Sequence, residues 1–398
     1  MTVLPHQPHS RYQPRRDFLP FSPPNITEEE IDAVVDTLRS GWITTGGKTN
    51  QFEKTFAEYI GAPAALALSS CTAGLHLAVR ILDLKPSDEV ITTTLTFCSS
   101  VHVIEHVGAK PILVDVEADT LTIDPARIAA AITPNTKAIL PVHYAGHPAE
   151  MDAIMQLARE HDLRVIEDAA HSLPATYHGQ KVGTIGDMTA FSFYATKNLT
   201  TGEGGMLTGS PEYIDRARLF SLHGMNRDAW KRYTAAGSWY YEVVEAGFKY
   251  NMTDMQAALG LVQLRRLEAM QARRREVVQT YNAAFADLPQ LQTPIAREGI
   301  GHAWHLYVLR LNLDTLTIDR GQFIDELKRR NIGTSVHFIP VHLHPYYRDK
   351  YGYQPEDFPV AYGEYQRMLS LPLHSSLSEA DLESVTEAVR DVCTVFAR

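Results

Sequence analysis

Lys197 is the residue whose type and position in this sequence best suit covalent chemistry. It follows the apolar run 189–193 and precedes the glycine-rich segment 202–205. Desolvation and nearby cations lower the pKa of a lysine, and the resulting neutral amine can form a Schiff base with a carbonyl compound. The structural alternative is a surface lysine whose stem lies over apolar residues. This segment alone is compatible with both interpretations.

Two further segments could hold charged parts of a ligand. Asp168 closes the apolar run 164–167, and a buried carboxylate is costly unless it is paired, for example with a protonated pyridine nitrogen. A helix cap or a loop hydrogen bond is the alternative for Asp168. The small residues 69–74 lie where a strand is expected to end and a helix to begin, so free N–H groups and the Thr72 hydroxyl suit a phosphate. Asn251 precedes another helical stretch and could cap it.

The elements that would position these residues alternate along the first half of the chain. Continuous apolar strands separated by helices indicate an α/β fold with a mainly parallel sheet covered on both faces. Ligands of such sheets bind at the carboxyl ends of the strands, so we expect chemistry in the loops there. The predicted strands are 64–68, 89–93, 111–116, 137–142, 164–167, 189–193 and 205–208, and the predicted helices are 73–82, 99–107, 125–132 and 149–161.

The ends of the chain carry separate signals. Thr27 and Glu30 form a capping-box pattern ahead of a helix, and Ser378 is expected to cap the last helix. A long helix is expected to begin near Asp254. After Pro289 the pattern of predicted elements changes to that of a smaller α+β domain. Its predicted elements are strands at 304–311 and 332–337 and a helix at 322–330, and the predicted division is an N-terminal arm (1–17), a large domain (18–288) and a small C-terminal domain (289–398).

Composition excludes several classes of protein. The 398 residues carry a net charge of −10 and are 44% hydrophobic, which favours a large core and disfavours binding to nucleic acid or anionic membranes. Cys71, Cys98 and Cys393 are too few for a disulfide framework or for the thiolates of an iron–sulfur cluster. No apolar run approaches the roughly 20 residues of a membrane helix, and the N-terminus lacks the apolar segment of a secretory signal. We expect a cytoplasmic protein without membrane insertion.

Two short motifs for other ligands fail on spacing or context. Five residues separate Gly41 from Gly47 where a phosphate-binding P-loop has four, and no strand precedes them. His102, Glu105 and His106 match a short inverted zinc-protease pattern, but the apolar residues between and beside them indicate a helix packed on the sheet. No metal site is expected.

Motifs of other enzyme classes are missing from the sequence or misplaced in it. Glu167 and Asp168 are adjacent, so a strand turns them to opposite faces and they cannot form the carboxylate pair of a glycosidase. The sequence has no Gly-x-Ser-x-Gly elbow and no Gly-x-Gly-x-x-Gly after a strand. Serine hydrolases and ordinary dinucleotide enzymes are therefore disfavoured.

Taken together, the segments resemble the DegT/StrS family of pyridoxal-phosphate-dependent sugar aminotransferases, from about Phe18 to the C-terminus. The resemblance implies the aspartate-aminotransferase-like fold (fold type I), with a mainly parallel seven-stranded sheet and a smaller α+β C-terminal domain. The segments that carry it are GWITTG (41–46), SSCTAGLHLA (69–78), PVHYAG (141–146), VIEDAAHS (165–172), SFYATKN (192–198) with GEGG (202–205), and FKYNMTD (248–254).

The resemblance implies roles around the cofactor ring. Lys197 should form the Schiff base with pyridoxal phosphate and carry the proton between the cofactor and the substrate carbon. Asp168 should hold the pyridine nitrogen protonated, which makes the ring an electron sink. Phe97 should stack on the ring, and His171 should lie near the ring and its phenolic oxygen.

The resemblance also implies contacts to the phosphate and the substrate. The Cys71 backbone, Thr72 and Ser192 should hold the phosphate, while Asn251 should reach the phosphate in a second subunit, which makes the active unit a homodimer with shared sites. The family usually has a smaller residue at Cys71 and often histidine at Tyr194. The residues expected to contact the sugar nucleotide are Thr44, Thr45, Tyr194, Lys249 and His337.

Within the family, the chain looks most like the enzymes that aminate C4 of a UDP-pentose. The supporting segments are GWITTG, PVHYAGHPAEMDAI, HAWHLYVLRL and IGTSVHFIPVH. The implied reaction moves the amino group of L-glutamate, through the pyridoxamine form of the cofactor, onto a nucleotide-linked 4-keto sugar. The products are a 4-amino sugar nucleotide, for lipopolysaccharide or antibiotic sugars, and 2-oxoglutarate.

Several alternatives remain open at this point. Amination could occur at C3, or on a dTDP- or GDP-linked keto-6-deoxysugar, or on a cyclitol. A pyridoxal-phosphate-dependent sugar dehydratase is disfavoured, because relatives of that type replace the lysine by histidine or add an iron–sulfur cluster. A non-catalytic regulator is disfavoured because Asp168 and Lys197 are both present.

Overall fold

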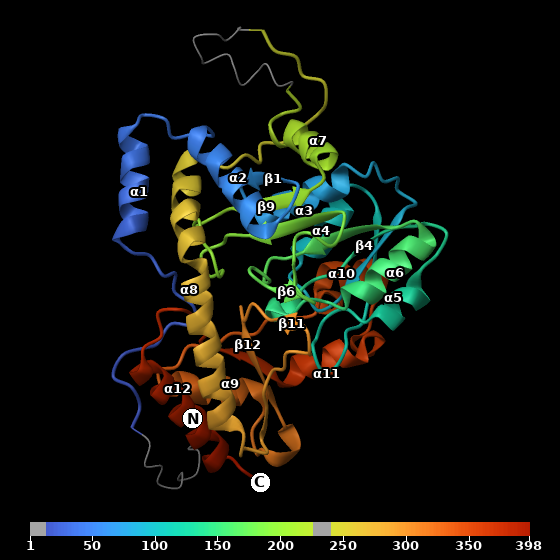
Figure 1. Ribbon diagram of the computed structural model, residues 1–398. Helices are drawn as coiled ribbons and strands as arrows, with labels where there is room; N and C mark the ends of the chain where they lie inside the picture. The colour runs from blue at the N-terminus through green and yellow to red at the C-terminus, as the bar shows by residue number, and fades with distance from the viewer. Residues whose placement is uncertain (1–12, 226–239) are drawn as a thin grey trace.

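The computed structural model describes residues 13–225 and 240–398 (Figure 1). A seven-stranded sheet has the order β1-β9-β8-β5-β4-β2-β3, and only β9 runs antiparallel to its neighbours. The predicted mainly parallel sheet of fold type I is thereby confirmed. The strands are β1 (Ala64–Leu68), β2 (Glu89–Thr93), β3 (Lys110–Val114), β4 (Thr136–Leu140), β5 (Arg164–Asp168), β8 (Met188–Ser192) and β9 (Gly205–Gly209).

Helices cover both faces of this sheet, as the apolar strands require. Alternate residues of one strand enter different cores: Ile166 packs with α3 and α7, while its neighbour Val165 packs with α5 and α6. Burial of both faces explains why the strands have no polar alternation. The helices of this part are α1 (Glu28–Arg39), α2 (Gly47–Ile60), α3 (Cys71–Arg80), α4 (Ser99–His106), α5 (Pro125–Ala131), α6 (Met151–His161) and α7 (Pro211–Ser221).

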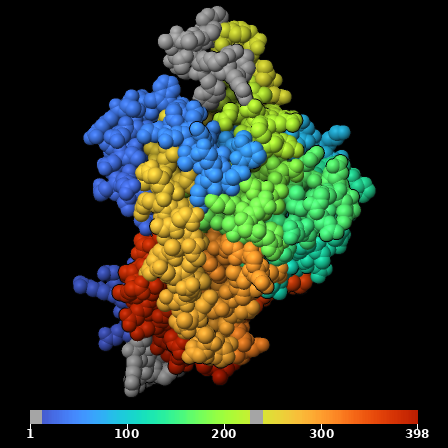
Figure 2. Space-filling view, viewed as in Figure 1, coloured from blue at the N-terminus to red at the C-terminus, as the bar shows by residue number. Residues whose placement is uncertain are grey.

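The long helix α8 (Asp254–Phe285) links the large sheet to a second core. Its first half packs on α1 and α2, and its last turns pack on a three-stranded sheet, β10-β12-β13 (Figures 1 and 2). Helices α9 and α12 cover that sheet, and the predicted boundary after residue 288 stays a prediction. The elements are β10 (Leu291–Gln292), β12 (Tyr307–Leu311), β13 (Met368–Leu371), α9 (Arg320–Arg329), α10 (Pro345–Tyr351), α11 (Pro359–Arg367) and α12 (Glu379–Val395).

Two signals at the helix starts appear as expected. The capping boxes of Thr27 with Glu30 and of Ser378 with Asp381 are both formed. Residues 1–12 of the predicted arm lie outside the described residues, and Arg15 forms an ion pair with Asp381. Smaller elements are β6 (Thr176–Tyr177), β7 (Gln180–Lys181) and β11 (Ile300–Gly301), which form a third sheet, and short 3₁₀ turns at Tyr144–Gly146, Leu313–Thr315, Val341–Leu343 and Pro355–Asp357.

The strand predicted at 332–337 is wrong. Its backbone pairs with two different partners, because Ile332 bridges Leu19 whereas Ser335 bridges Ser370 in β13. The changed partner leaves no continuous ladder, and the segment continues as a loop to His337 at the large sheet. Within the described ranges, no helix is long and apolar enough to cross a bilayer.

Candidate active site

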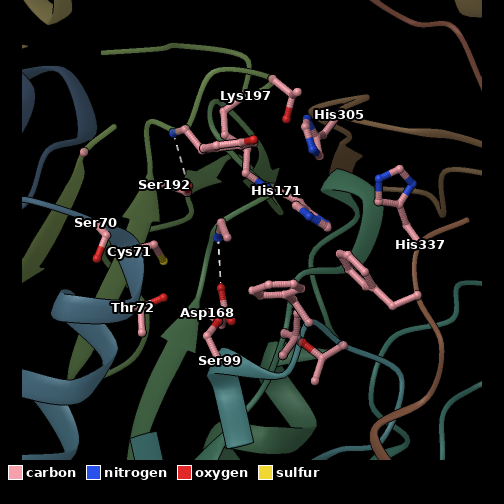
Figure 3. A pocket seen from close by; sticks show the side chains of 18 of the residues that line it. Ser70, Cys71, Thr72, Ser99, Asp168, His171, Ser192, Lys197, His305 and His337 are labelled. Atoms are coloured by element: carbon pink, nitrogen blue, oxygen red, sulfur yellow. Dashed lines mark hydrogen bonds between the residues drawn. The ribbon is translucent and has the colours of Figure 1, made fainter. Parts of the chain in front are cut away.

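A cavity of about 450 Å³ lies at the carboxyl ends of the parallel strands, where the topology predicts ligand binding. The loops after β1, β2, β4, β5 and β8 all contribute to it, and residues 305, 337 and 338 line it from the second core. Figure 3 shows His305 and His337 on that side. Of the predicted site residues, those in its lining are Cys71, Thr72, Phe97, Asp168, His171, Ser192, Tyr194, Lys197 and His337.

The turn from β1 into α3 forms one end of the cavity. The Ser70 hydroxyl caps α3 by accepting a hydrogen bond from the N–H of Ala73, at 3.0 Å. The next two residues, Cys71 and Thr72, therefore present a helix N-terminus to the cavity, which favours an anion. Burial holds the pKa of the Cys71 thiol well above its usual range, so this side chain stays protonated and packs against its neighbours. Ser192 lies on the same side of the cavity in Figure 3.

Asp168 lies at the end of β5, where its backbone accepts from and donates to the segment after β4. Its carboxylate accepts hydrogen bonds from the Ser100 hydroxyl at 2.7 Å and the N–H of Ala170 at 3.0 Å. Burial nevertheless raises the pKa of Asp168, because desolvation outweighs these bonds. Within the described part of the chain, no cation lies at ion-pair distance from this carboxylate. A protonated ring nitrogen would therefore give this buried carboxylate the positively charged partner that it lacks among the described residues.

Glu167 points to the opposite face of β5 and does not enter the cavity. Its carboxylate binds His143 Nε2 at 2.9 Å, the Thr189 hydroxyl at 2.7 Å and the N–H of Gly186 at 2.8 Å. The two adjacent acids therefore have separate functions, as the alternation of a strand requires.

Lys197 lies in the tight turn that follows β8. Its N–H donates to the carbonyl of Tyr194 at 3.0 Å, and Thr201 donates to the carbonyl of Phe193 at 2.9 Å. The protein around the side chain disfavours the charged amine and lowers the pKa of Lys197 to about 8, against the opposing effects of Cys71 and Asp168. A substantial fraction of the amine is thus neutral near physiological pH and able to attack a carbonyl.

Three histidines form the remaining polar wall. Burial and the charge of Lys197 lower the pKa of His337 to about 4 and hold the pKa of His171 and of His305 well below the usual range. His171 stacks on Phe338 with ring centroids 5.6 Å apart. Neutral imidazoles leave Lys197 as the only titrating cation among the described lining residues.

Four predicted residues lie outside the cavity of the single chain. The Asn251 amide donates to the Thr45 hydroxyl at 2.7 Å, and Lys249 donates to the Asn251 carbonyl oxygen. Thr44 uses its carbonyl to accept from the N–H of Asp254. These residues form a cluster of their own beside the end of β1, and their roles toward a ligand stay predictions.

Sequence reasoning missed several lining or supporting residues. Ser100 supports Asp168 from the first turn of α4, and His305 and Phe338 reach the cavity from the second core. The only sequence signal for His305 was its place in the segment HAWHLYVLRL. Nothing in that segment indicates that it lies near Lys197 in the fold.

The described residues contain no cluster of three or more potential metal-ligating side chains. Pyridoxal phosphate fits the groups that are present: a helix N-terminus with hydroxyls for its phosphate, a buried unpaired carboxylate for its pyridine nitrogen, and Lys197 for its aldehyde.

Comparison with known proteins also indicates a pyridoxal-phosphate-dependent enzyme. A model of the DegT/DnrJ/EryC1/StrS aminotransferase family matches residues 24–390. The spore coat polysaccharide biosynthesis protein SpsC of Bacillus subtilis is 53% identical over 382 residues, which are 96% of this chain and 98% of that protein. An uncharacterized protein of Methanocaldococcus jannaschii is 54% identical over 379 residues, covering 95% and 98%.

Solved structures share the whole architecture. Spr1654 from Streptococcus pneumoniae, assigned as a sugar aminotransferase, has a TM-score of 0.89 and 38% identity in its pyridoxamine phosphate form, with 94% of this chain and 99% of that chain covered. It was also solved with pyridoxal phosphate. PseC of Helicobacter pylori, an aminotransferase of pseudoaminic acid biosynthesis, has a TM-score of 0.89 and 27% identity, covering 96% and 100%. The chain therefore belongs to the DegT/DnrJ/EryC1/StrS aminotransferase family, and it is a pyridoxal-phosphate-dependent transaminase.

Proposed function

We propose that this protein transfers the amino group of L-glutamate onto C4 of a nucleotide-linked 4-keto sugar, of the UDP-4-keto-pentose type, and releases 2-oxoglutarate. The observation that carries the chemistry is one cavity with an unpaired buried Asp168 at one side and Lys197 with its lowered pKa at another. The sugar class is supported by relatives named for spore coat polysaccharide and pseudoaminic acid biosynthesis. The pentose and the C4 position rest on the resemblance of the sequence segments.

The residues that line or support the cavity have separate tasks in this reaction. When bound, pyridoxal phosphate supplies an electron sink that stabilises negative charge on the substrate carbon. Asp168 keeps a proton on the ring nitrogen, and Ser100 keeps the carboxylate in place. The N-terminus of α3 with Thr72 and Ser192 binds the phosphate, and Phe97 covers the ring. Lys197 accepts the proton from the carbon of the amino donor.

The same lysine donates a proton to the sugar carbon in the second half of the reaction. Its pKa of about 8 suits both directions of transfer, because the amine and the ammonium form are both well populated near that pH. Neutral histidines and aromatic rings line the cavity around this amine.

We also place Asn251 at the phosphate of a second subunit, in a homodimer with shared sites. Within one chain Asn251 stands outside the cavity, with its amide on Thr45 and its oxygen bonded by Lys249. A second copy would bring this cluster, and the sugar contacts proposed for Thr44, Thr45 and Lys249, to the neighbouring cavity. Tyr194 and His337 would contact the sugar from within the same chain.

The substrate is tested with ¹⁵N-labelled L-glutamate and UDP-4-keto-pentose. The expected result is a UDP-amino sugar that carries ¹⁵N at C4, detected by mass spectrometry and NMR, with one 2-oxoglutarate per product. Label at C3, or transfer only to a dTDP- or GDP-linked keto-6-deoxysugar or to a cyclitol, would contradict the substrate assignment. The inactive control is Lys197→Ala.

A further inference from the structure

His305 occupies a position in the cavity that the reaction described above does not use. It precedes β12, lies beside Lys197 and His171 (Figure 3), and retains only 6% of its surface exposure. Its ring centroid is 4.5 Å from that of His171, and Lys197 is the charged residue that most affects its pKa. This imidazole therefore lies in the part of the cavity where the Lys197 amine is found.

The hydrogen bonds of Asn198 fix which ring nitrogen of His305 carries a proton. The Asn198 amide nitrogen donates to the carbonyls of Leu173, at 2.9 Å, and Ala303, at 2.8 Å. Both amide protons are thereby used, so the atom that faces His305 Nδ1 at 3.2 Å is the amide oxygen, which only accepts. His305 Nδ1 must be the donor in this contact.

The remaining nitrogen of His305 is therefore a bare acceptor. Because burial and the nearby Lys197 keep the pKa of His305 well below its usual range, the ring is neutral and Nε2 carries a lone pair without a proton. Nδ1 points to Asn198, which lies outside the cavity lining, so Nε2 is on the side of the ring that faces the cavity.

In His171 the two ring nitrogens have the opposite roles, with Nδ1 as the acceptor and Nε2 as the donor. Its Nδ1 accepts the N–H of Ala145 at 3.3 Å, so its own ring proton is on Nε2. The two described rings are in contact but are not joined by a hydrogen bond. The cavity thus offers one neutral donor, on His171, and one neutral acceptor, on His305, close to the reacting amine.

We infer that His305 Nε2 accepts a hydrogen bond from a hydroxyl group of the acceptor sugar, on the carbon next to the reacting ketone. This inference rests on the proposed function. An acceptor without a proton cannot bind a carbonyl or carboxylate oxygen, whereas a sugar hydroxyl is a suitable donor. The neighbouring carbon is favoured because the ketone itself must face Lys197, beside which His305 lies.

The consequence is selectivity for hydroxyketone sugars. A substrate that lacks this hydroxyl leaves the buried Nε2 unsatisfied, and sites built around a hydrogen bond reject such analogues strongly. We expect the wild-type enzyme to prefer UDP-4-keto-pentose over its 3-deoxy analogue by about 10–100-fold in kcat/KM.

Variants at two cavity positions test the contact. His305→Phe keeps the ring and removes both nitrogens, so it should reduce the preference to about 1–3-fold, through a loss on the hydroxylated substrate. His305→Gln supplies a new acceptor and should restore part of the preference. Phe338→Leu is the matched control, because it changes the volume of the same cavity without removing a hydrogen-bonding group, and it should keep the wild-type ratio.

The outcomes separate this inference from the proposed function. An unchanged ratio in His305→Phe would overturn the inference, as would an equally reduced ratio in Phe338→Leu. If wild-type enzyme consumes L-glutamate but does not aminate UDP-4-keto-pentose, the proposed substrate is wrong. The ratio of kcat/KM values is then measured with dTDP-linked 4-keto-6-deoxysugars with and without the 3-hydroxyl. An unchanged ratio in His305→Phe, or an equally reduced ratio in Phe338→Leu, would again overturn the inference.

Discussion

At the scale of single residues, the burial of Lys197 controls how fast the enzyme takes up its cofactor. The neutral amine is the reactive form, and burial lowers the pKa of Lys197 to about 8 from the ordinary lysine range. The rate at which apoenzyme binds pyridoxal phosphate should therefore rise with pH, reach half its maximum near pH 8 and level off above it. Stopped-flow absorbance between pH 6 and 10 measures this profile. A midpoint near that of a free lysine would contradict the proposed environment.

Ser100 determines how well Asp168 stays ionised. Its hydroxyl lies 2.7 Å from the carboxylate and 2.9 Å from the Thr96 hydroxyl, and it lowers a carboxyl pKa that burial raises. Ser100→Ala should raise the pKa of Asp168 further and weaken pyridoxal phosphate binding by about tenfold, or about 1.4 kcal/mol.

Equilibrium titration of apoenzyme by fluorescence gives this affinity. Ser99→Ala is the matched control, because the structure gives that neighbouring residue no hydrogen bond to Asp168, and Ser100→Thr should retain the affinity. Equal losses in Ser99→Ala and Ser100→Ala would show that Asp168 does not depend on this hydroxyl.

At the scale of elements, Asp254 ties α8 to α2 and explains the segment that resembles a P-loop. Its carboxylate accepts from the N–H of Gly46 and of Thr49, both at 2.8 Å, and from the N–H of Lys48 at 3.1 Å. The N-terminus of α2 thus binds a carboxylate of its own chain where a P-loop would bind phosphate. Asp254→Ala should lower the free energy of unfolding by about 2–3 kcal/mol, because four donors, these three N–H groups and the Thr49 hydroxyl, lose their acceptor.

Chemical denaturation of holoenzyme measures this loss. Asp254→Asn keeps one acceptor oxygen and should lose less than Asp254→Ala. Wild-type stability in Asp254→Ala would show that water replaces the carboxylate. The contact between α2 and α8 through Asp254 would then contribute nothing to the free energy of unfolding.

The elements that sequence could predict are those whose signals are local. The strands of the large sheet are mostly apolar. Asp168 ends β5 and Lys197 lies in the turn after β8, so topology alone brings them to one edge. Helix α2 was missed because its N-terminal cap is a carboxylate more than 200 residues away, not a neighbouring side chain. The segment 332–337 was assigned wrongly because its pairing partners lie in two different parts of the chain. His305 was missed because its orientation depends on the amide of Asn198.

At the scale of the whole molecule, the separation of the Asn251 cluster from the cavity predicts a shared site. Co-expressed Lys197→Ala and Asn251→Ala chains would form hybrid dimers, in which one of the two sites combines both native residues. Random pairing should restore about one quarter of wild-type activity from two inactive or weak parents. The unfractionated mixture of co-expressed chains, assayed with L-glutamate and keto sugar, gives the result. Activity no greater than the average of the parents would place Asn251 at its own chain's site or at none.

The visible absorption spectrum of purified holoenzyme, before and after L-glutamate is added, tests whether Lys197 and Asp168 hold a cofactor that accepts the amino group of L-glutamate. We expect an absorption band of bound pyridoxal phosphate that L-glutamate removes, with one 2-oxoglutarate formed per subunit. We expect Lys197→Ala to lack the band. A band that L-glutamate leaves unchanged would contradict glutamate as the donor. A reconstituted wild-type protein without any such band would contradict the assignment of Lys197 and Asp168 to the cofactor.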